Sequence, residues 1–163
     1  MTISQRVKRK VFVSHSSKDR AFVLRLTKVL TRYKISYWYS DRHIVGAKQW
    51  HDEIGRALAQ CNWFLVVLTP NSVRSQWVKR ELLFALNENR YNEKIIPLLY
   101  KPCNHSRLSW TLREFEFAEF AGDFEEGCKN LLRVWGIKYR PESDHGPASK
   151  GRAKPRRKWG SRS

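Results

Sequence analysis

Short apolar runs alternate with amphipathic stretches along this chain. Runs rich in β-branched and aromatic residues predict strands, and stretches in which apolar residues recur every three or four positions predict helices. The predicted strands are 11–14, 35–39, 63–68, 94–100 and 115–120, and the predicted helices lie around 17–33, 50–61, 75–87 and 131–135. Strands that alternate with helices indicate an α/β fold whose central parallel sheet is covered on both faces.

A candidate helix cap and a proline refine this pattern. Ser16 or Ser17 precedes the first helical stripe and is a candidate N-cap. Pro97 interrupts the fourth predicted strand. Because proline has no backbone N–H to donate, it indicates an edge strand, a strand end or a bulge at this position.

Polar segments follow the first three predicted strands. They are 14–16, 40–46 and 69–72, and the helix of residues 75–87 starts near the last of them. In an open parallel sheet the ligand cleft lies beyond the carboxyl ends of the strands. We therefore expect the functional residues in these segments, where Ser14, His15 and Ser16 offer hydroxyl and amide donors to a ligand. The alternative role for these serines is simple helix capping.

One carboxylate stands out in the helix of residues 75–87. Trp77 and Glu81 are four residues apart, a spacing that places both on one helix face. Lys79 and Arg80 directly precede the carboxylate and would favour its ionised form. Two interpretations follow: a Trp anchor beside a solvated Glu, or a carboxylate that belongs to a functional site.

The chain has 163 residues and a formal net charge of +17. This length suits one domain. We expect a basic N-terminal tail over 1–8, a domain over 9–137 and a disordered basic C-terminal tail over 138–163. That last segment has nine basic and two acidic residues, so it would attract polyanions without sequence specificity, or serve only solubility.

Composition excludes several classes of protein. Cys61, Cys103 and Cys128 are odd in number and far apart, so they offer neither a CxxC metal pair nor a disulfide framework, and we expect no metal site. The apolar runs are too short to span a membrane, and the protein is expected to be soluble and cytoplasmic. Neither GxGxxG nor a P-loop is present, which argues against a redox dinucleotide cofactor and against ATPase activity.

Four motifs in order resemble those of a bacterial Toll/interleukin-1 receptor (TIR) domain over residues 9–137. Residues 11–16 resemble the first box of the family, 41–46 its BB loop, 68–72 the end of its third strand and 75–82 the motif that holds the catalytic glutamate of NAD-cleaving TIR enzymes. The resemblance implies a three-layer, flavodoxin-like fold with a central parallel five-stranded sheet.

The same resemblance implies an activity. It is that of an NAD+ glycohydrolase or ADP-ribosyl cyclase in signalling or antiphage defence, with NAD as substrate, no cofactor and Glu81 as the catalytic residue. The implied substrate-binding residues are Ser14, His15, Ser16, Asp41, Gly46, Trp50 and Trp77. Trp50 would stack on nicotinamide, with a core anchor as its alternative role, and self-association through TIR–TIR contacts would involve the BB loop.

Two rival functions remain open from the sequence. One is a non-catalytic TIR module that pairs with other TIR domains, and the other is a nucleic-acid-associated protein whose tail dominates. Release of nicotinamide from NAD separates the enzyme from both. The product, linear or cyclic ADP-ribose, is not determined by the residues.

Overall fold

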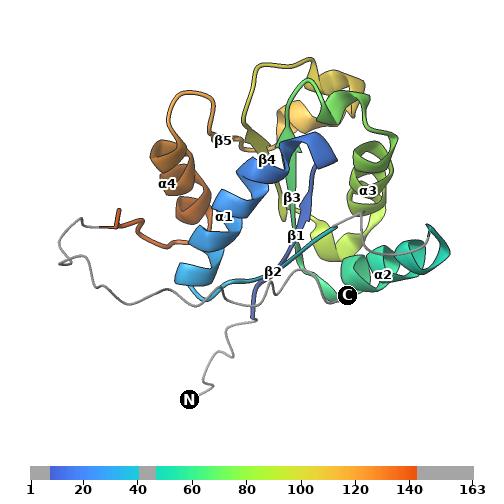
Figure 1. Ribbon diagram of the computed structural model, residues 1–163, viewed down its shortest axis with the longest axis horizontal. Coiled ribbons are helices and arrows are strands. Elements are labelled where there is room, and N and C mark those ends of the chain that lie inside the picture. Colours follow the sequence, from blue (N-terminus) through green and yellow to red (C-terminus); the bar gives the residue numbers. More distant parts are fainter. Residues whose placement is uncertain (1–7, 41–46, 143–163) are drawn as a thin grey trace.

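Five parallel strands form one sheet in the computed structural model, which describes residues 8–40 and 47–142 (Figure 1). The strands are β1 (Lys10–Ser14), β2 (Ser36–Tyr39), β3 (Trp63–Leu68), β4 (Ile95–Leu99) and β5 (Ala118–Glu119). Their order across the sheet is β2-β1-β3-β4-β5, the flavodoxin-like order of doubly wound folds. The predicted five-stranded parallel sheet is confirmed.

Helices cover both faces of this sheet. They are α1 (Arg20–Arg32), α2 (Ala47–Gln60), α3 (Gln76–Asn87) and α4 (Phe124–Val134). Figure 1 shows α1 and α4 on one face, and α2 and α3 on the other. Successive strand residues point to opposite faces, so Val11 and Val13 pack in the core under α1 and α4, whereas Phe12 packs in the core under α2 and α3.

Pro97 lies inside the sheet, which corrects the predicted edge, end or bulge. β4 pairs with β3 on one side and with β5 on the other. Tyr100 donates its backbone N–H to Leu68 at 3.1 Å on the β3 side. Because backbone groups alternate along a strand, Pro97 directs its nitrogen away from β3, toward β5. β5 pairs only with Leu98 and Leu99, so no ladder bond is lost at Pro97.

The strand predicted over 115–120 is shorter than expected. Only Ala118 and Glu119 form β5. The 3-10 helix η5 (Trp110–Glu114) ends just before it. Phe115 and Phe117 pack against the core under α2 and α3 instead of joining the sheet.

The packed chain continues past Ile137, where the predicted domain ended. Tyr139 is buried within the α1/α4 core. The backbone N–H of Arg140 donates to the Tyr33 hydroxyl at 2.8 Å. The segment after α4 is therefore held against the end of α1, as Figure 1 shows.

A close contact fixes α4 on the sheet. A Cβ atom at Gly127 would lie 2.2 Å from a ring carbon of Phe120. This approach is possible only for glycine. Asp123 caps the helix, because its carboxylate accepts the backbone N–H of Glu125 at 3.0 Å.

Two of the three cysteines are buried, one in each core. Cys61 lies in the core under α2 and α3, and Cys128 in the core under α1 and α4. Burial raises the pKa of the Cys61 thiol to about 11 and that of the Cys128 thiol to about 12. Cys103 is half-buried.

Within the described part of the chain, no helix combines the length and the apolar character needed to cross a membrane.

Candidate functional site

Buried polar side chains gather at the carboxyl edge of the sheet. Among the described residues, eight of the nine buried polar side chains lie on or beside the strand ends there, and Thr27 is the exception. The eight are Ser14, His15, Ser16, Asp19, Ser40, Thr69, Ser72 and Glu81. Burying polar groups is unfavourable unless they are bonded, so this concentration marks the edge where the candidate site lies.

The end of β1 contributes three of the predicted residues. Ser14 is fully buried, and its hydroxyl has no hydrogen-bond partner among the described residues. His15 packs edge-on against Tyr39 with ring centroids 5.9 Å apart. Ser16 accepts the backbone N–H of Lys18 at 3.3 Å and caps the 3-10 helix η1 (Ser17–Asp19). Ser16 therefore caps a helix as predicted.

Asp19 ties the end of β1 to the end of β3. Its side chain is 4% exposed. The Thr69 hydroxyl donates to one carboxylate oxygen at 2.5 Å and the Asn71 amide donates to the other at 3.2 Å. The backbone N–H of Ser72 donates in turn to the Thr69 hydroxyl at 3.1 Å. These hydrogen bonds join the end of β1 to the end of β3, so the network holds two site segments in a fixed relation.

Sequence reasoning missed Asp19. In the sequence it is one charge in a short polar stretch before the first helical stripe. The available signal was that Asp19 and Thr69 both follow the ends of predicted strands that neighbour each other in a parallel sheet, where carboxyl ends meet.

Glu81 lies in the second turn of α3 and is only 4% exposed. The interpretation of a solvated Glu is therefore wrong. Ser75 caps this helix and accepts the backbone N–H of Val78 at 3.3 Å. The helix begins at the carboxyl end of β3, and this is why Glu81 comes close to the strand ends.

Trp77 lies one turn before Glu81 and joins α3 to α2. Its ring is half-buried, 4.8 Å from the ring of His51 on α2. The Arg80 guanidinium lies 5.2 Å from the same indole, a cation–π distance. Trp77 therefore links α3 to α2 one helical turn before the buried Glu81.

The remaining predicted residues are not placed by the structure. Asp41 and Gly46 lie outside the described residues, and so does the rest of the predicted BB loop. Trp50 is in the first turn of α2, but its side chain lies outside the described part. No group of three or more His, Cys, Asp or Glu side chains arranged to hold a metal ion occurs within the described residues.

The buried edge, the strand order and the motif spacing agree with one family. The TIR domain family matches residues 11–132. The chain belongs to this family.

Three curated relatives share 25% to 27% identity with this TIR domain. The "probable 2' cyclic ADP-D-ribose synthase TcpO" of Methanobrevibacter olleyae is 26% identical over 91 residues, 55% of this chain. The "NAD(+) hydrolase TcpC" of Escherichia coli is 27% identical over 100 residues, 60% of this chain. The "2' cyclic ADP-D-ribose synthase BtTIR" of Bacteroides thetaiotaomicron is 25% identical over 92 residues. The matched region spans 27% to 33% of the lengths of these relatives.

Solved TIR structures share the fold. The TIR domain of the Toll-related receptor TRR-2 from Hydra magnipapillata superposes with a TM-score of 0.63 at 22% identity, covering 78% of this chain and 98% of that domain. A metazoan TIR-STING receptor from C. gigas gives a TM-score of 0.62 at 20% identity over 76% of this chain and 38% of the receptor. These likenesses concern the fold.

Proposed function

We propose that this TIR domain cleaves the bond between nicotinamide and ribose in NAD, with Glu81 as the catalytic residue. The observation that carries the proposal is the burial of a glutamate, 4% exposed, on α3 beside the buried polar edge of the sheet. The names of the three curated relatives, two cyclic ADP-ribose synthases and one NAD hydrolase, support the same chemistry. The product is ADP-ribose, linear or cyclic, and NAD is a substrate here, not a cofactor.

The reaction needs few groups from the protein. Nicotinamide leaves as a neutral molecule from a cationic pyridinium, so no general acid has to protonate it. Positive charge develops on the ribose as the bond breaks, as in other glycosyl transfers. Water, or a second nucleophile within the substrate in the cyclising case, then adds to the anomeric carbon.

A buried carboxylate suits this charge development. At about 4 Å and an effective dielectric near 20, a carboxylate stabilises a unit cation by about 4 kcal/mol. That energy corresponds to roughly a thousandfold in rate. A carboxylate removed from water also has no solvent shell to reorganise during the step.

Other residues of the edge would orient the substrate. We assign the buried Ser14 hydroxyl, which has no partner among the described residues, to a ribose or phosphate oxygen. The Asp19 network fixes the backbone around it. We assign Trp50 and Trp77 to the nicotinamide end and Asp41 and Gly46 to substrate binding, and we assign the BB loop to a subunit contact that completes the site. His15 and Ser16 supply backbone donors.

The test is NAD turnover by the purified protein with product analysis. Glu81→Gln keeps the shape of the buried side chain and removes its charge, so we expect a loss of about a thousandfold with the fold retained. Glu116→Gln, an exposed glutamate, is the matched control and should keep full activity. Wild-type turnover by a folded Glu81→Gln variant would refute the assignment.

The second candidate is a non-catalytic module that pairs with other TIR domains. It is favoured by exposed apolar side chains, among them Leu83 and Phe84 on α3 and Trp110 on η5, with exposures of 41%, 39% and 64%. A wild-type protein that associates by light scattering but releases no nicotinamide would support it. For the enzyme, we expect specific activity to rise with protein concentration, and we place its action in cytoplasmic signalling or antiphage defence.

A further inference from the structure

Positive charge is concentrated at the amino edge of the sheet, opposite the candidate site. We define the amino-edge face as the segments that lead into strands β1 to β4 or follow helix α4: residues 8–10, 32–34, 59–62, 88–94 and 133–142. These segments contain ten Lys or Arg and three Glu. The charge of the described chain is therefore far from uniform.

The carboxyl edge provides the comparison. The segments around the other ends of the strands are 14–20, 69–76 and 100–126. They contain six basic and seven acidic residues. Of the two edges of the sheet, only the amino edge therefore carries an excess of cations.

Specific contacts hold the amino-edge face together. The Arg9 guanidinium donates to the backbone carbonyl of Trp135 at 3.1 Å and lies 5.8 Å from its indole ring. Asn62, before β3, accepts the backbone N–H of Lys10 at 2.9 Å and donates to the carbonyl of Lys8 at 3.1 Å. These contacts bring the start of β1, the start of β3 and the end of α4 to one surface.

Most of these cations are available to a ligand. Of the ten, only Arg32 and Arg90 form ion pairs with described carboxylates, Glu142 and Glu88. The exposed members are Lys8, Lys10, Arg32, Lys34, Arg90, Arg133, Lys138 and Arg140. Several of them lie at helix C-termini, where the helix dipole favours positive charge.

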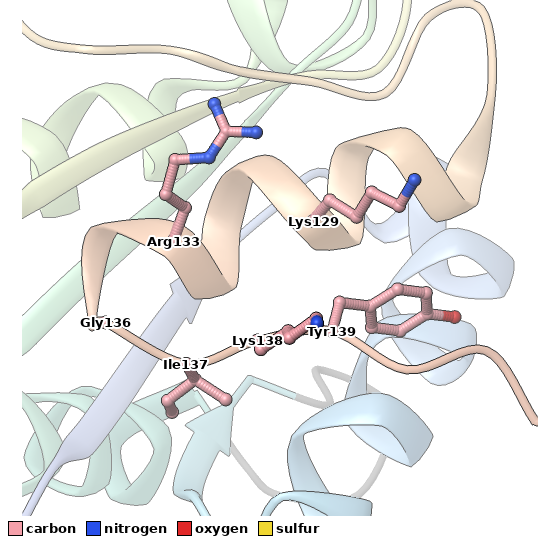
Figure 2. A pocket seen from close by; sticks show the side chains of 6 residues that line it. All are labelled: Lys129, Arg133, Gly136, Ile137, Lys138 and Tyr139. Atoms are coloured by element: carbon pink, nitrogen blue, oxygen red, sulfur yellow. The ribbon is translucent and has the colours of Figure 1, made fainter.

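A groove of about 440 Å³ opens between α4 and the segment that follows it. Figure 2 shows Lys129 and Arg133 extending from the helix in different directions, with Lys138 and Tyr139 on the returning segment. The cations are spread along the groove and do not converge on one point. Such a spread fits a row of phosphates better than a single anion.

We propose that the amino-edge face binds the phosphate backbone of nucleic acid without reading base sequence. A duplex carries one negative charge per about 1.7 Å of its axis, so spread cations neutralise several phosphates at once and release counterions. The exposed cations and the groove belong to the packed body of the domain, and the proposal does not depend on the tail.

The exposed apolar side chains argue against a membrane surface as the partner. Binding in the plane of a bilayer requires apolar groups that enter it. Of the five large apolar side chains that are exposed in the described part of the chain, four lie outside the amino-edge face: Leu24, Leu83, Phe84 and Trp110. The fifth, Val134, lies within it and is 36% exposed. The amino-edge face therefore carries positive charge but little apolar surface that could enter a bilayer.

The test measures binding of labelled DNA and RNA duplexes of about 20 base pairs to the full chain over a series of salt concentrations. The variant is Lys10→Gln/Arg133→Gln/Lys138→Gln. The control is Lys101→Gln/Arg107→Gln/Arg113→Gln, three exposed cations of the carboxyl edge. We expect the first to lower the logarithmic salt slope by about 2 to 3 and the low-salt affinity by at least about tenfold, and the control to change both little.

Three results would overturn the proposal. They are equal losses in the two triple variants, no loss in the amino-edge variant, and an amino-edge loss seen with phosphatidylserine vesicles but not with either duplex. Thermal unfolding shows whether each variant is folded. If the triple variant is not, the single substitutions make the same test, and each should lower the slope by about one.

Discussion

The two edges of the sheet hold their polar groups in opposite ways. At the carboxyl edge, polar side chains are buried and bonded to one another, as Asp19 is to Thr69. At the amino edge, cations such as Lys10 and Lys138 are exposed. Burial fixes the position of a polar group, because the structure must supply its partners. The first edge is therefore suited to orienting a small substrate, and the second to recognising charge.

Removing Asp19 should produce the largest change in stability. Asp19→Ala leaves the Thr69 hydroxyl and the Asn71 amide without their acceptor. Losing this buried acceptor and leaving two donors unpaired lowers the free energy of unfolding by about 2 to 3 kcal/mol. Urea denaturation measures this loss. Glu119→Ala, an exposed carboxylate at the same edge, should change it by less than about 0.5 kcal/mol, and similar values for both variants would mean that the network is not stabilising.

Ser14→Ala separates a binding role from a structural one. Its buried hydroxyl has no partner among the described residues, so removing it should leave stability within about 0.5 kcal/mol of wild type. If the hydroxyl binds NAD, the KM should rise about tenfold, the equivalent of one hydrogen bond. An unchanged KM would remove Ser14 from the site. Steady-state kinetics and urea denaturation provide the two measurements.

The buried thiols predict a loss of stability at alkaline pH. Burial raises the pKa of Cys61 from 9.0 to about 11, although Lys10 and Arg90 of the amino-edge face lower it. The folded state therefore keeps the thiol proton that the unfolded state releases. The stabilisation is complete below pH 9 and is lost as the pH rises through about 11. Urea denaturation between pH 7 and 11 should show a shallower decline for Cys61→Ala than for wild type.

Among the substitutions expected to change the free energy of unfolding, the replacement of Lys34 should have the smallest effect. It follows α1 with a φ angle of 57°, a conformation that glycine adopts without strain. Lys34→Gly should raise the free energy of unfolding by up to about 1 kcal/mol. Lys34→Ala, which removes the same charge and keeps a Cβ atom, should not. A gain in both variants would assign the effect to charge repulsion at the amino edge.

The regular part of the fold could be predicted because its signals are local. Hydrophobic periodicity gave the strands and the helices, and the Ser16 cap follows from its place before η1. Two other features depend on neighbours that are distant in the sequence. Pro97 costs the sheet no hydrogen bond only because β5, toward which its nitrogen points, is too short to pair with it. Tyr139 is buried only because α1 ends beside it.

Some features of the candidate site could likewise be predicted from local sequence, and others could not. The motif around Glu81 could be found from spacing, but its burial could not, because burial depends on how α3 lies against the sheet. Asp19 was missed because its partners, Thr69 and Asn71, lie about 50 residues away in the sequence. Local patterns identify elements, whereas a polar network is a property of their assembly.

The contact between Gly127 and Phe120 has a consequence for how sequences related to this one can vary. A Cβ atom at position 127 would overlap the ring, at 2.2 Å from its nearest atom. A chain that carries alanine or serine at this position must therefore carry a residue smaller than phenylalanine at position 120, or move α4 outward. The two positions should co-vary across the family, and the double substitution Gly127→Ala/Phe120→Leu should be tolerated better than Gly127→Ala alone.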